Sequence, residues 1–382
     1  MNVTKKVSSV VLINNNLKIA ISFIISKVTK IIYTGPFSFL NFKVKKKKFK
    51  LNHKEVLIKT LLCGICGSDK KIISFDYSLN STAFPDTSRQ DKKETYLGHE
   101  LVGRVEATGN NVKKLKKNDL VILDSINRNY HNLKKNEYGG WSNFLVRNEN
   151  QLFKIKNRLK KEQAILIEPL ACSLNSVIEA NINNKKKNIL IIGTGIIGLG
   201  VYIFLRYFFK NINITFLSND KVSKKILNND KNINSINPSK LMSETSKILN
   251  TNVKKFLTNK ITSSGFDYIF ECSGDDKVLK KIVKICNYNS KIILTGMIMK
   301  NAKFDLTPLW LRNIKLISPN GYKLKYNFKK ISNTFEFIQR LIINNKVDVS
   351  VIKIEKINFE NWKTALKKRK VGVIKNVLQF SN

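Results

Sequence analysis

A glycine-rich turn in the second half of the chain constrains the fold more than any other feature. The sequence from residue 188 reads NILIIGTGIIGLGVYIF, a short β-branched run followed by an apolar stretch of helical length. Between them lies the pattern G-x-G-x-x-G, at Gly193, Gly195 and Gly198. Gly193 permits a tight turn, Gly195 removes a Cβ that would block a pyrophosphate, and Gly198 lets the helix approach the strand. Backbone N–H groups at the helix start, at Ile196 and Ile197, would then hold the diphosphate of a dinucleotide.

Strand and helix patterns alternate after this turn. Strands are predicted over 213–218, 266–274 and 291–297, and a helix over 275–286. Such alternation, with right-handed crossovers, gives a doubly wound parallel sheet that binds its ligand beyond the carboxyl ends of the strands. Ser218, Cys272 and Gly296 lie at such ends and are predicted to line the cofactor. Cys272 is also typical of a small buried residue.

The end of the second strand bears on the choice between NAD and NADP. NAD-binding sheets usually carry an acid about 20 residues beyond the glycines, where it bonds the ribose 2′-hydroxyl. This chain has Phe-Leu-Ser at 216–218, and Asp220 comes slightly late. Three lysines follow, Lys221, Lys224 and Lys225. Together with the Ser218 hydroxyl they could accept a 2′-phosphate, so the sequence leans to NADP and leaves NAD open.

The first half of the chain contains a pair of cysteines in LLCGICGSDKK (61–71). The pair could be a redox couple, half of a zinc knuckle, or one metal ligand beside a bystander. No second close cysteine pair exists in the sequence, and the βαβ context of a thioredoxin-like site is missing. Cys63 ends an alternating strand pattern, where a small half-buried side chain suffices. Cys66 lies beside Ser68, and we predict that its thiolate faces a cleft together with His99.

Further ligand candidates are His99 and Glu100, which follow each other at one bend, and Glu168. The chain has three histidines, and a satisfied core histidine is the alternative for His99. Glu168 lies within the apolar run ILIEPLAC. Burying an unpaired carboxylate is costly, so Glu168 requires a metal, a cation or several donors. Cysteine, histidine and carboxylate with one open position suit a catalytic zinc.

Taken together, the motifs resemble the zinc-containing medium-chain dehydrogenases, particularly the sorbitol, glucose and threonine dehydrogenase branch. GICGSD, GHELVG, EPLAC, GTGIIG and a closing KVGVIKNVLQF occur in that family's order and spacing, from about residue 50 to the end. The resemblance implies that Cys66 and His99 bind one catalytic zinc. Glu100 and Glu168 would supply further ligands that exchange with water or substrate. It also implies that Ser68 relays the substrate proton with Asp69 as its neighbouring acid, although Asp69 could equally cap a turn.

In one region the sequence departs from this family. Most zinc members carry a lobe of four close cysteines that binds a second, structural zinc, whereas residues 124–142 here contain no cysteine. We therefore expect a single zinc. The aromatic and histidine residues of this stretch are interpreted as loop and packing residues, with a substrate-facing Trp141 as the alternative; they are Tyr130, His131, Tyr138 and Trp141.

The resemblance implies an α/β plus β architecture, a GroES-like β-barrel catalytic domain with an inserted Rossmann domain. The predicted domains are 1–177, 178–320 and 321–382, the last returning to the catalytic domain. The predicted function is zinc-dependent, NAD(P)-linked oxidation of a secondary alcohol such as a polyol or sugar, by hydride transfer to the nicotinamide. One alternative is a zinc-free quinone reductase-like enzyme, which the ligand set opposes. Another is a non-catalytic dinucleotide-binding protein derived from a dehydrogenase.

Composition adds limits on partners and compartment. The 382 residues include 69 Lys+Arg against 27 Asp+Glu. The excess is spread along the chain with abundant Asn and Ile, as an AT-rich coding sequence would produce, so we expect no nucleic-acid partner and keep an anionic partner as a minor alternative. Five cysteines form no disulfide framework, and the apolar stretch 17–26 is too short to span a bilayer. The first forty residues look strand-like. We expect a cytoplasmic protein without a membrane partner. A homo-oligomer is compatible with the sequence.

Overall fold

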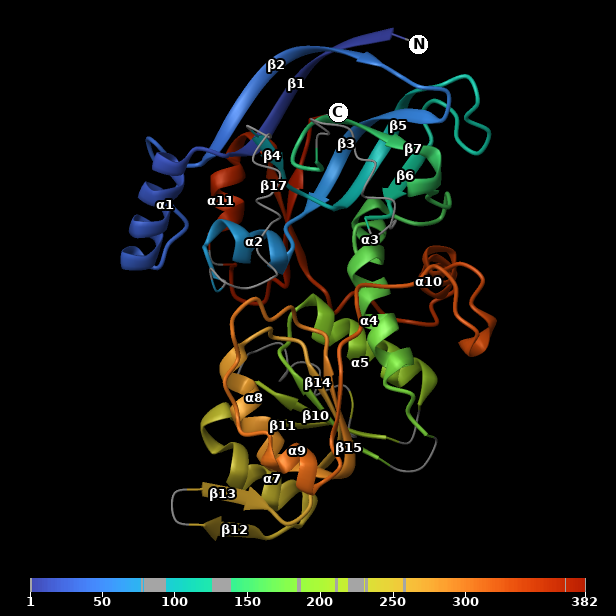
Figure 1. Ribbon diagram of the computed structural model, residues 1–382. Helices are drawn as coiled ribbons and strands as arrows, with labels where there is room; N and C mark the ends of the chain where they lie inside the picture. Colours follow the sequence, from blue (N-terminus) through green and yellow to red (C-terminus); the bar gives the residue numbers. More distant parts are fainter. Residues whose placement is uncertain are drawn as a thin grey trace. The chain divides into compact units, whose positions relative to one another are not determined.

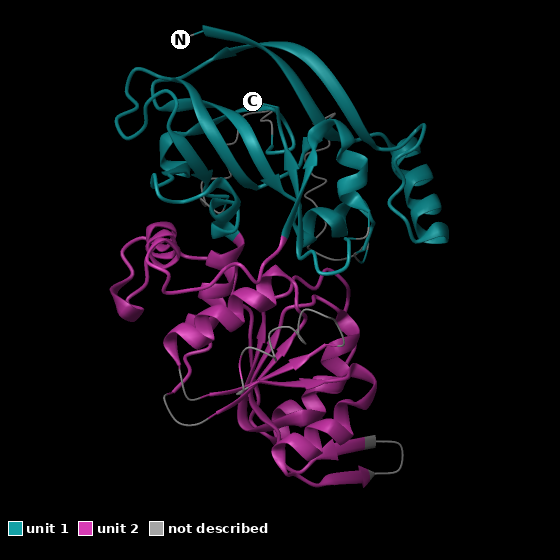
Figure 2. Cartoon of the chain, turned by 180° about the vertical axis from the view of Figure 1, so that it is seen from behind, with its two compact units in different colours: residues 1–168, 354–382 teal, residues 169–353 magenta. Residues whose placement is uncertain are grey.

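The computed structural model of this chain describes most of the sequence; the described residues are 2–76, 78, 94–125, 139–183, 187–209, 212–218, 230, 233–256, 259–367 and 369–381. The chain forms two compact units (Figure 2). The first unit comprises residues 1–168 and 354–382, and the second comprises residues 169–353.

The first unit is built on a seven-stranded sheet (Figure 1). Its strands are β3 (Glu55–Gly64), β5 (Glu100–Thr108), β6 (Leu120–Leu123), β7 (Phe144–Asn148), β8 (Leu152–Lys154), β17 (Ile354–Asn358) and β18 (Lys375–Gln379). The order is β17-β18-β3-β5-β6-β8, with β7 also paired to β3. β3 pairs with β5, β7 and β18. Most of its side chains are buried, and its sequence EVLIKTLLCG is apolar apart from Glu55, Lys59, Thr60 and the final glycine.

A second sheet of the first unit has the order β2-β1-β4. Its strands are β1 (Asn2–Ile13), β2 (Leu40–Lys50) and β4 (Glu94–Tyr96). The strand-like reading of the first forty residues is wrong between β1 and β2, where residues 16–29 form helix α1 (Asn16–Thr29). The helix starts there because the Asn15 side chain accepts a hydrogen bond from the Lys18 backbone N–H at 3.0 Å, as a helix-capping residue does.

Short helices complete the first unit. They are α2 (Gly67–Ile73), α3 (Lys161–Ala164) and α11 (Trp362–Leu366), with the 3₁₀ turns η3 (Glu149–Gln151) and η7 (Phe359–Asn361). The hydrophobic core gathers Cys63, Ile73 and Trp141 with the apolar side of α11. The backbone N–H of Val10 donates to the Trp141 carbonyl at 2.9 Å, and this bond joins the N-terminal sheet to the rest of the unit.

The second unit contains a six-stranded sheet in the order β11-β10-β9-β14-β15-β16, and all its pairs are parallel. The strands are β9 (Asn188–Ile192), β10 (Asn213–Leu217), β11 (Ile233–Ile236), β14 (Phe266–Glu271), β15 (Cys286–Leu294) and β16 (Lys315–Ile317). The hairpin β12 (Val253–Phe256) and β13 (Asn259–Thr262) is separate. The doubly wound sheet expected from the sequence is confirmed.

The second unit also contains six helices among its described residues, of which α4 precedes the first strand of the sheet and α10 follows the last (Figure 1). They are α4 (Ile167–Glu179), α5 (Ile196–Phe208), α7 (Leu241–Leu249), α8 (Asp276–Ile282), α9 (Thr307–Leu311) and α10 (Thr334–Ile343), with the 3₁₀ turns η4 (Pro238–Lys240), η5 (Val283–Ile285) and η6 (Phe328–Lys330). The helix predicted over 275–286 is α8 followed by η5. The strand predicted over 291–297 begins earlier, because Cys286 already pairs with Phe266 of β14.

The units divide at residues 168 and 353, whereas the sequence-based boundaries lie at 177 and 320. Residues 321–353 belong with the second unit because they pack on its helices. The Tyr326 hydroxyl donates to Asn175 Oδ1 at 3.0 Å, and Asn175 Nδ2 donates to the Gly321 carbonyl at 2.9 Å. The rings of Phe208 and Phe328 also meet, with centroids 5.1 Å apart.

Candidate functional site

Cys66 lies where β3 gives way to α2. It is the residue that immediately precedes the helix, and its backbone N–H donates to Asp69 Oδ2 at 3.2 Å. Asp69 is buried, and Ser68 is half-buried in the first turn of the same helix. The short helix therefore fixes three predicted residues, Cys66, Ser68 and Asp69, next to one another.

The bend that precedes β5 brings two further candidates to Cys66. Gly98 has φ +90, and a Cβ at this position would overlap the Trp141 side chain, so the bend depends on glycine. His99 follows the bend and Glu100 begins β5. Single ligand atoms of Cys66, His99 and Glu100 all lie within 4.8 Å of one another. The structure thus brings together three of the four predicted metal ligands in one group.

The two cysteines of the CGIC stretch have different surroundings. Cys63 is fully buried in the core beside Trp141, and burial raises the pKa of its thiol well above the usual value. Trp141 is 1% exposed, which confirms its interpretation as a packing residue. Cys66 is half-buried and belongs to the ligand group. One cysteine is part of the core and the other is available for chemistry.

Sequence reasoning missed Lys375, which lies in the same site. This lysine is 3% exposed, and its Nζ lies 2.7 Å from Glu100 Oε1 and 2.5 Å from Glu100 Oε2. It comes from β18, where Val377 pairs with Gly64 of β3. A Cβ on Gly64 would overlap both Glu100 Oε2 and Lys375 Cε. The signal that could have found it is a lone lysine inside the apolar run VGVIKNVLQF.

Glu168, in the first turn of α4, is 5% exposed. Its Oε1 accepts a hydrogen bond from the Ser125 hydroxyl at 2.8 Å. Burial raises the pKa of Glu168 to about 7; the negative charge of Glu100 adds to this shift, while His99 and the Ser125 hydrogen bond oppose it. Ser125 is a second residue that the sequence did not indicate, and it follows β6 without any distinctive motif.

The ionisable side chains of the site shift one another's pKa values. His99 Nδ1 lies 3.7 Å from Asp69 Oδ1. Burial alone would lower the pKa of His99, but the charges of Cys66 and Asp69 raise it well above its usual value. Burial also raises the pKa of Asp69. A thiolate, an imidazole and carboxylates are ligands that zinc prefers, so this set of side chains fits a zinc ion.

The glycine turn of the second unit has the geometry that its sequence requires. Gly193, directly after β9, has φ +91, a conformation that favours glycine. A Cβ on Gly198 would overlap the Gly193 carbonyl oxygen, so the close approach of α5 depends on this glycine. No described atom lies within 4 Å of a Cβ built on Gly195, which precedes the first residue of α5. The space that a pyrophosphate would need over Gly195 is open.

Other predicted cofactor residues gather at the carboxyl ends of the parallel strands. Ser218 follows β10, and Cys272 follows β14 with its backbone N–H donating to the Ile192 carbonyl at 3.0 Å. A Cβ on Gly296 would overlap the Gly274 backbone nitrogen. The roles of these residues, and of Ile196 and Ile197 at the start of α5, stay predictions. Several other residues singled out in the sequence lie outside the described ones: Tyr130, His131, Tyr138, Asp220, Lys221, Lys224 and Lys225.

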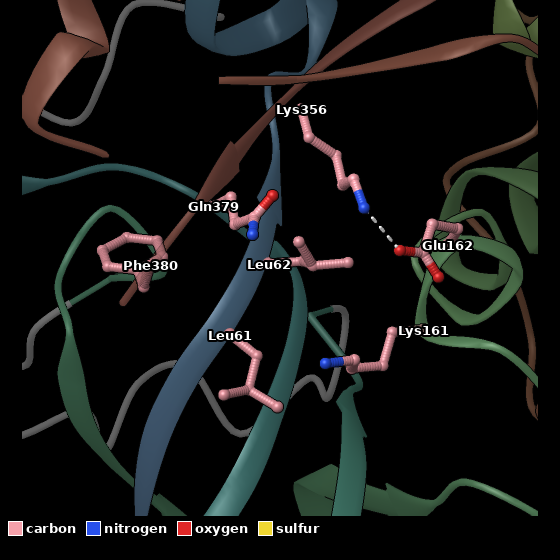
Figure 3. A pocket seen from close by; sticks show the side chains of 7 residues that line it. All are labelled: Leu61, Leu62, Lys161, Glu162, Lys356, Gln379 and Phe380. Atoms are coloured by element: carbon pink, nitrogen blue, oxygen red, sulfur yellow. Dashed lines mark hydrogen bonds and ion pairs between the residues drawn. The ribbon is translucent and has the colours of Figure 1, made fainter. Parts of the chain in front are cut away.

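A small hollow on the first unit lies apart from the ligand group (Figure 3). Its lining residues are Leu61, Leu62, Lys161, Glu162, Lys356, Gln379 and Phe380. Lys356 Nζ and Glu162 Oε1 form an ion pair across it at 2.8 Å. No predicted ligand lines this hollow, and its carboxylate is already paired, so we do not assign the chemistry of the chain to it.

Comparison with known proteins identifies two family segments. Residues 52–157 match the alcohol dehydrogenase GroES-like domain, and residues 244–340 match the zinc-binding dehydrogenase domain. L-idonate 5-dehydrogenase from Vitis vinifera is 25% identical over 325 residues, which cover 80% of this chain and 81% of that protein. Sorbitol dehydrogenase from Arabidopsis thaliana is 23% identical over 324 residues, which cover 80% and 82% of the two chains.

Among solved structures, acetophenone reductase from Geotrichum candidum in complex with NAD superimposes with a TM-score of 0.70. The two sequences are 16% identical, and the match covers 98% of this chain and 97% of that chain. At this level of identity the likeness shows the fold. The predicted combination of a GroES-like domain and a Rossmann sheet is confirmed.

Proposed function

Because the chain belongs to the zinc-type medium-chain dehydrogenase/reductase family, and is an NAD(P)-linked alcohol dehydrogenase, we propose that it interconverts a polyol or sugar alcohol and its carbonyl form at a single zinc ion. The observation that carries the proposal is the group of Cys66, His99 and Glu100, whose ligand atoms all lie within 4.8 Å of one another. Retention of this donor set opposes a zinc-free or purely binding role.

Cys66, His99 and Glu168 are the ligands that we propose for zinc. Glu100 lies closer to the other two ligands, but both of its oxygens contact Lys375 Nζ. Glu168 has a neutral hydroxyl as its hydrogen-bond partner, and burial raises its pKa to about 7. We therefore assign Glu168 as the ligand and Glu100 as the carboxylate that places Lys375, with exchange between the two carboxylates as the alternative.

Bound zinc would polarise the alcohol oxygen and lower its pKa. The residues of the chain then handle the proton and the orientation of the ligands. Ser68, in the turn that follows Cys66, would carry the alcohol proton outward. Asp69, whose Oδ1 faces His99 Nδ1, would hold the imidazole so that its other nitrogen is presented to the metal.

For the cofactor, we propose that the turn at Gly193, Gly195 and Gly198 holds the diphosphate on backbone N–H groups of α5. The proposal is supported by the open space over Gly195 and by the tight packing at Gly198. We favour NADP over NAD because β10 ends in Leu217 and is followed by Ser218, without an acid to bond a ribose 2′-hydroxyl.

A polyol or sugar is proposed as substrate because relatives that match four fifths of the chain include L-idonate 5-dehydrogenase and sorbitol dehydrogenase. The test is a panel of polyols, sugars and simple alcohols with NAD and with NADP, on zinc-loaded protein. We expect reduced cofactor with at least one polyol or sugar, and a faster reaction with NADP. Activity that persists after zinc removal would instead favour the zinc-free alternative.

Metal content gives an independent check. We expect one zinc per chain by elemental analysis, because the described residues hold one ligand group and the 124–142 stretch contains no cysteine. Two tightly held zinc ions, or none after loading, would contradict the proposed site.

A further inference from the structure

Helix α1 directs large apolar side chains into solvent. Leu17, Ile24 and Val28 are 67%, 59% and 78% exposed, and their spacing places them on one side of the helix. Ile31 and Phe37, in the loop after the helix, are 68% and 69% exposed. We call these five residues the α1 surface. Figures 1 and 2 show α1 at the margin of the first unit.

The opposite side of α1, which packs on the protein, carries serines. Ser22 Oγ accepts from the Phe39 backbone N–H at 3.0 Å, and Ser26 Oγ accepts from the Tyr33 backbone N–H at 3.1 Å. Phe23 packs edge-on against Phe75, with ring centroids 5.5 Å apart. The usual helix of a globular protein buries its apolar side and exposes its polar side. In α1 the outer side exposes large apolar side chains instead, and an exposed apolar patch of this kind marks a surface that contacts a protein or a membrane.

The charge around the α1 surface indicates which kind of partner binds there. Residues 1–51 contain eleven lysines and no Asp or Glu. Lys43 and Lys45 pair with Glu94. Lys46, Lys47, Lys48 and Lys50 are exposed on β2, and Lys27 and Lys30 are exposed at the end of α1. A second copy of the chain would bring the same positive charge to the contact. The partner should therefore be both apolar and anionic.

We propose that the α1 surface binds the surface of an anionic lipid bilayer. Its apolar side chains would enter the boundary between headgroups and acyl chains, while the lysines contact the lipid phosphates. Among the described residues, no helix is long and apolar enough to cross a membrane, so the contact is superficial. The proposal departs from the expectation of no membrane partner, which rested on the lack of a spanning segment and could not reveal the exposed side of α1.

The test uses the full chain and vesicles. Wild-type protein should sediment with vesicles of phosphatidylcholine mixed with phosphatidylglycerol, and should remain in solution with phosphatidylcholine alone. The double variant I24E/V28E should reduce vesicle binding by about tenfold or more, because two apolar side chains no longer enter the boundary. The matched control L306E/L311E makes the same charge change at two residues of the second unit that are each 62% exposed, and should bind like the wild type.

Each of the following outcomes would overturn the proposal. Equal binding of the wild type and I24E/V28E would mean that charge alone attracts the chain, and failure of the wild type to bind any vesicle would remove the lipid partner. A change from dimer to monomer in I24E/V28E without lipid would assign the α1 surface to a second copy instead. The variant Val28→Trp keeps the α1 surface apolar and reports on its insertion. The fluorescence of the new tryptophan should be quenched by brominated lipid in anionic vesicles. Absence of quenching would contradict insertion.

Discussion

The two units prepare for their ligands in different ways. In the first unit the candidate site consists of ionisable side chains drawn from distant parts of the sequence: Cys66 and His99 are half-buried, and Glu168 and Lys375 are buried. In the second unit the candidate site consists of six consecutive residues, 193–198, whose glycines permit the turn and leave room for a ligand. Ligand binding at the first site depends on the charged side chains that are present, and ligand binding at the second depends on the side-chain atoms that glycine lacks. Substitutions at the first site should therefore change zinc content, whereas substitutions at the second site should change cofactor binding.

The largest effect should come from Cys66→Ser. A neutral hydroxyl is a much poorer zinc ligand than a thiolate, so we expect loss of zinc and a fall in kcat/KM of about a thousandfold or more, with cofactor binding unchanged. Cys63→Ala is the matched control, because Cys63 lies in the core outside the ligand group. It should keep zinc and most activity at a cost on the order of 1 kcal/mol in unfolding free energy. Equal loss from both variants would show that the cysteines act as a pair.

Gly195→Val should produce the reverse pattern. The branched side chain would occupy the space proposed for the pyrophosphate, so NAD(P) binding should weaken by about a hundredfold or more while zinc content stays at one. The variant should fold, since no described atom lies within 4 Å of a Cβ at this position. Gly198→Val is the contrast, because its side chain would overlap the Gly193 carbonyl and lower thermal stability. Normal cofactor titration by the Gly195 variant would disprove the assignment of the turn.

Lys375→Met tests the buried charge of the first site. Glu100 is 1% exposed, and without the lysine its charge would be buried and unpaired, so the unfolding free energy should fall by about 3 kcal/mol. Lys323→Met in the second unit removes the same charge from a solvent-exposed pair with Glu179 and should cost less than about 1 kcal/mol. Chemical denaturation measures the unfolding free energy of both variants. Similar small losses would mean that Glu100 does not require Lys375.

The smallest effect concerns Glu94, at the edge of the first unit. Burial alone would raise the pKa of Glu94, but hydrogen bonds from Lys43, Tyr96 and Lys45 lower it to about 2. An unfolded glutamate titrates near pH ~4.3, so the stabilisation is complete above that pH and is lost as the pH falls toward 2. Thermal melts of Glu94→Gln and wild type should differ at pH 7 by less than about 1 kcal/mol, and the difference should shrink below pH ~4. A constant difference would exclude the charge as the cause.

The sequence predicted most reliably what depends on neighbouring residues. The turn at 193–198 and the strand before it follow from glycine positions and a short apolar run, and both are found where they were expected. Cys66, His99 and Glu100 come together through the bend at Gly98. Lys375 and Ser125 reach the site through strand pairing and chain return, which no local pattern encodes. Even so, the reasoning that singled out Glu168 in an apolar run applies equally to Lys375.

In the N-terminal region the local sequence pattern predicted the wrong secondary structure. Its Ile- and Val-rich sequence looks strand-like, yet the chain forms α1 where Asn15 caps a helix. Which side of that helix faces solvent is decided by hydrogen bonds from Phe39 and Tyr33 to its serines. These contacts join residues on both sides of a loop, so composition alone could not assign the apolar side to solvent.

The long separation in sequence between Lys375 and Glu100 has a consequence for biosynthesis. Lys375 and Glu100 are 275 positions apart in sequence, and ribosomes add about 5 to 20 residues per second. A nascent chain would therefore hold Cys66, His99 and Glu100 for roughly 15 to 55 seconds before the matching lysine is made. During this interval the second unit can fold on its own segment, while strand β3 lacks its partner β18. The pair of Glu100 and Lys375 can form only after β18 has been made, so a chain stalled before residue 375 should leave the buried Glu100 without its lysine.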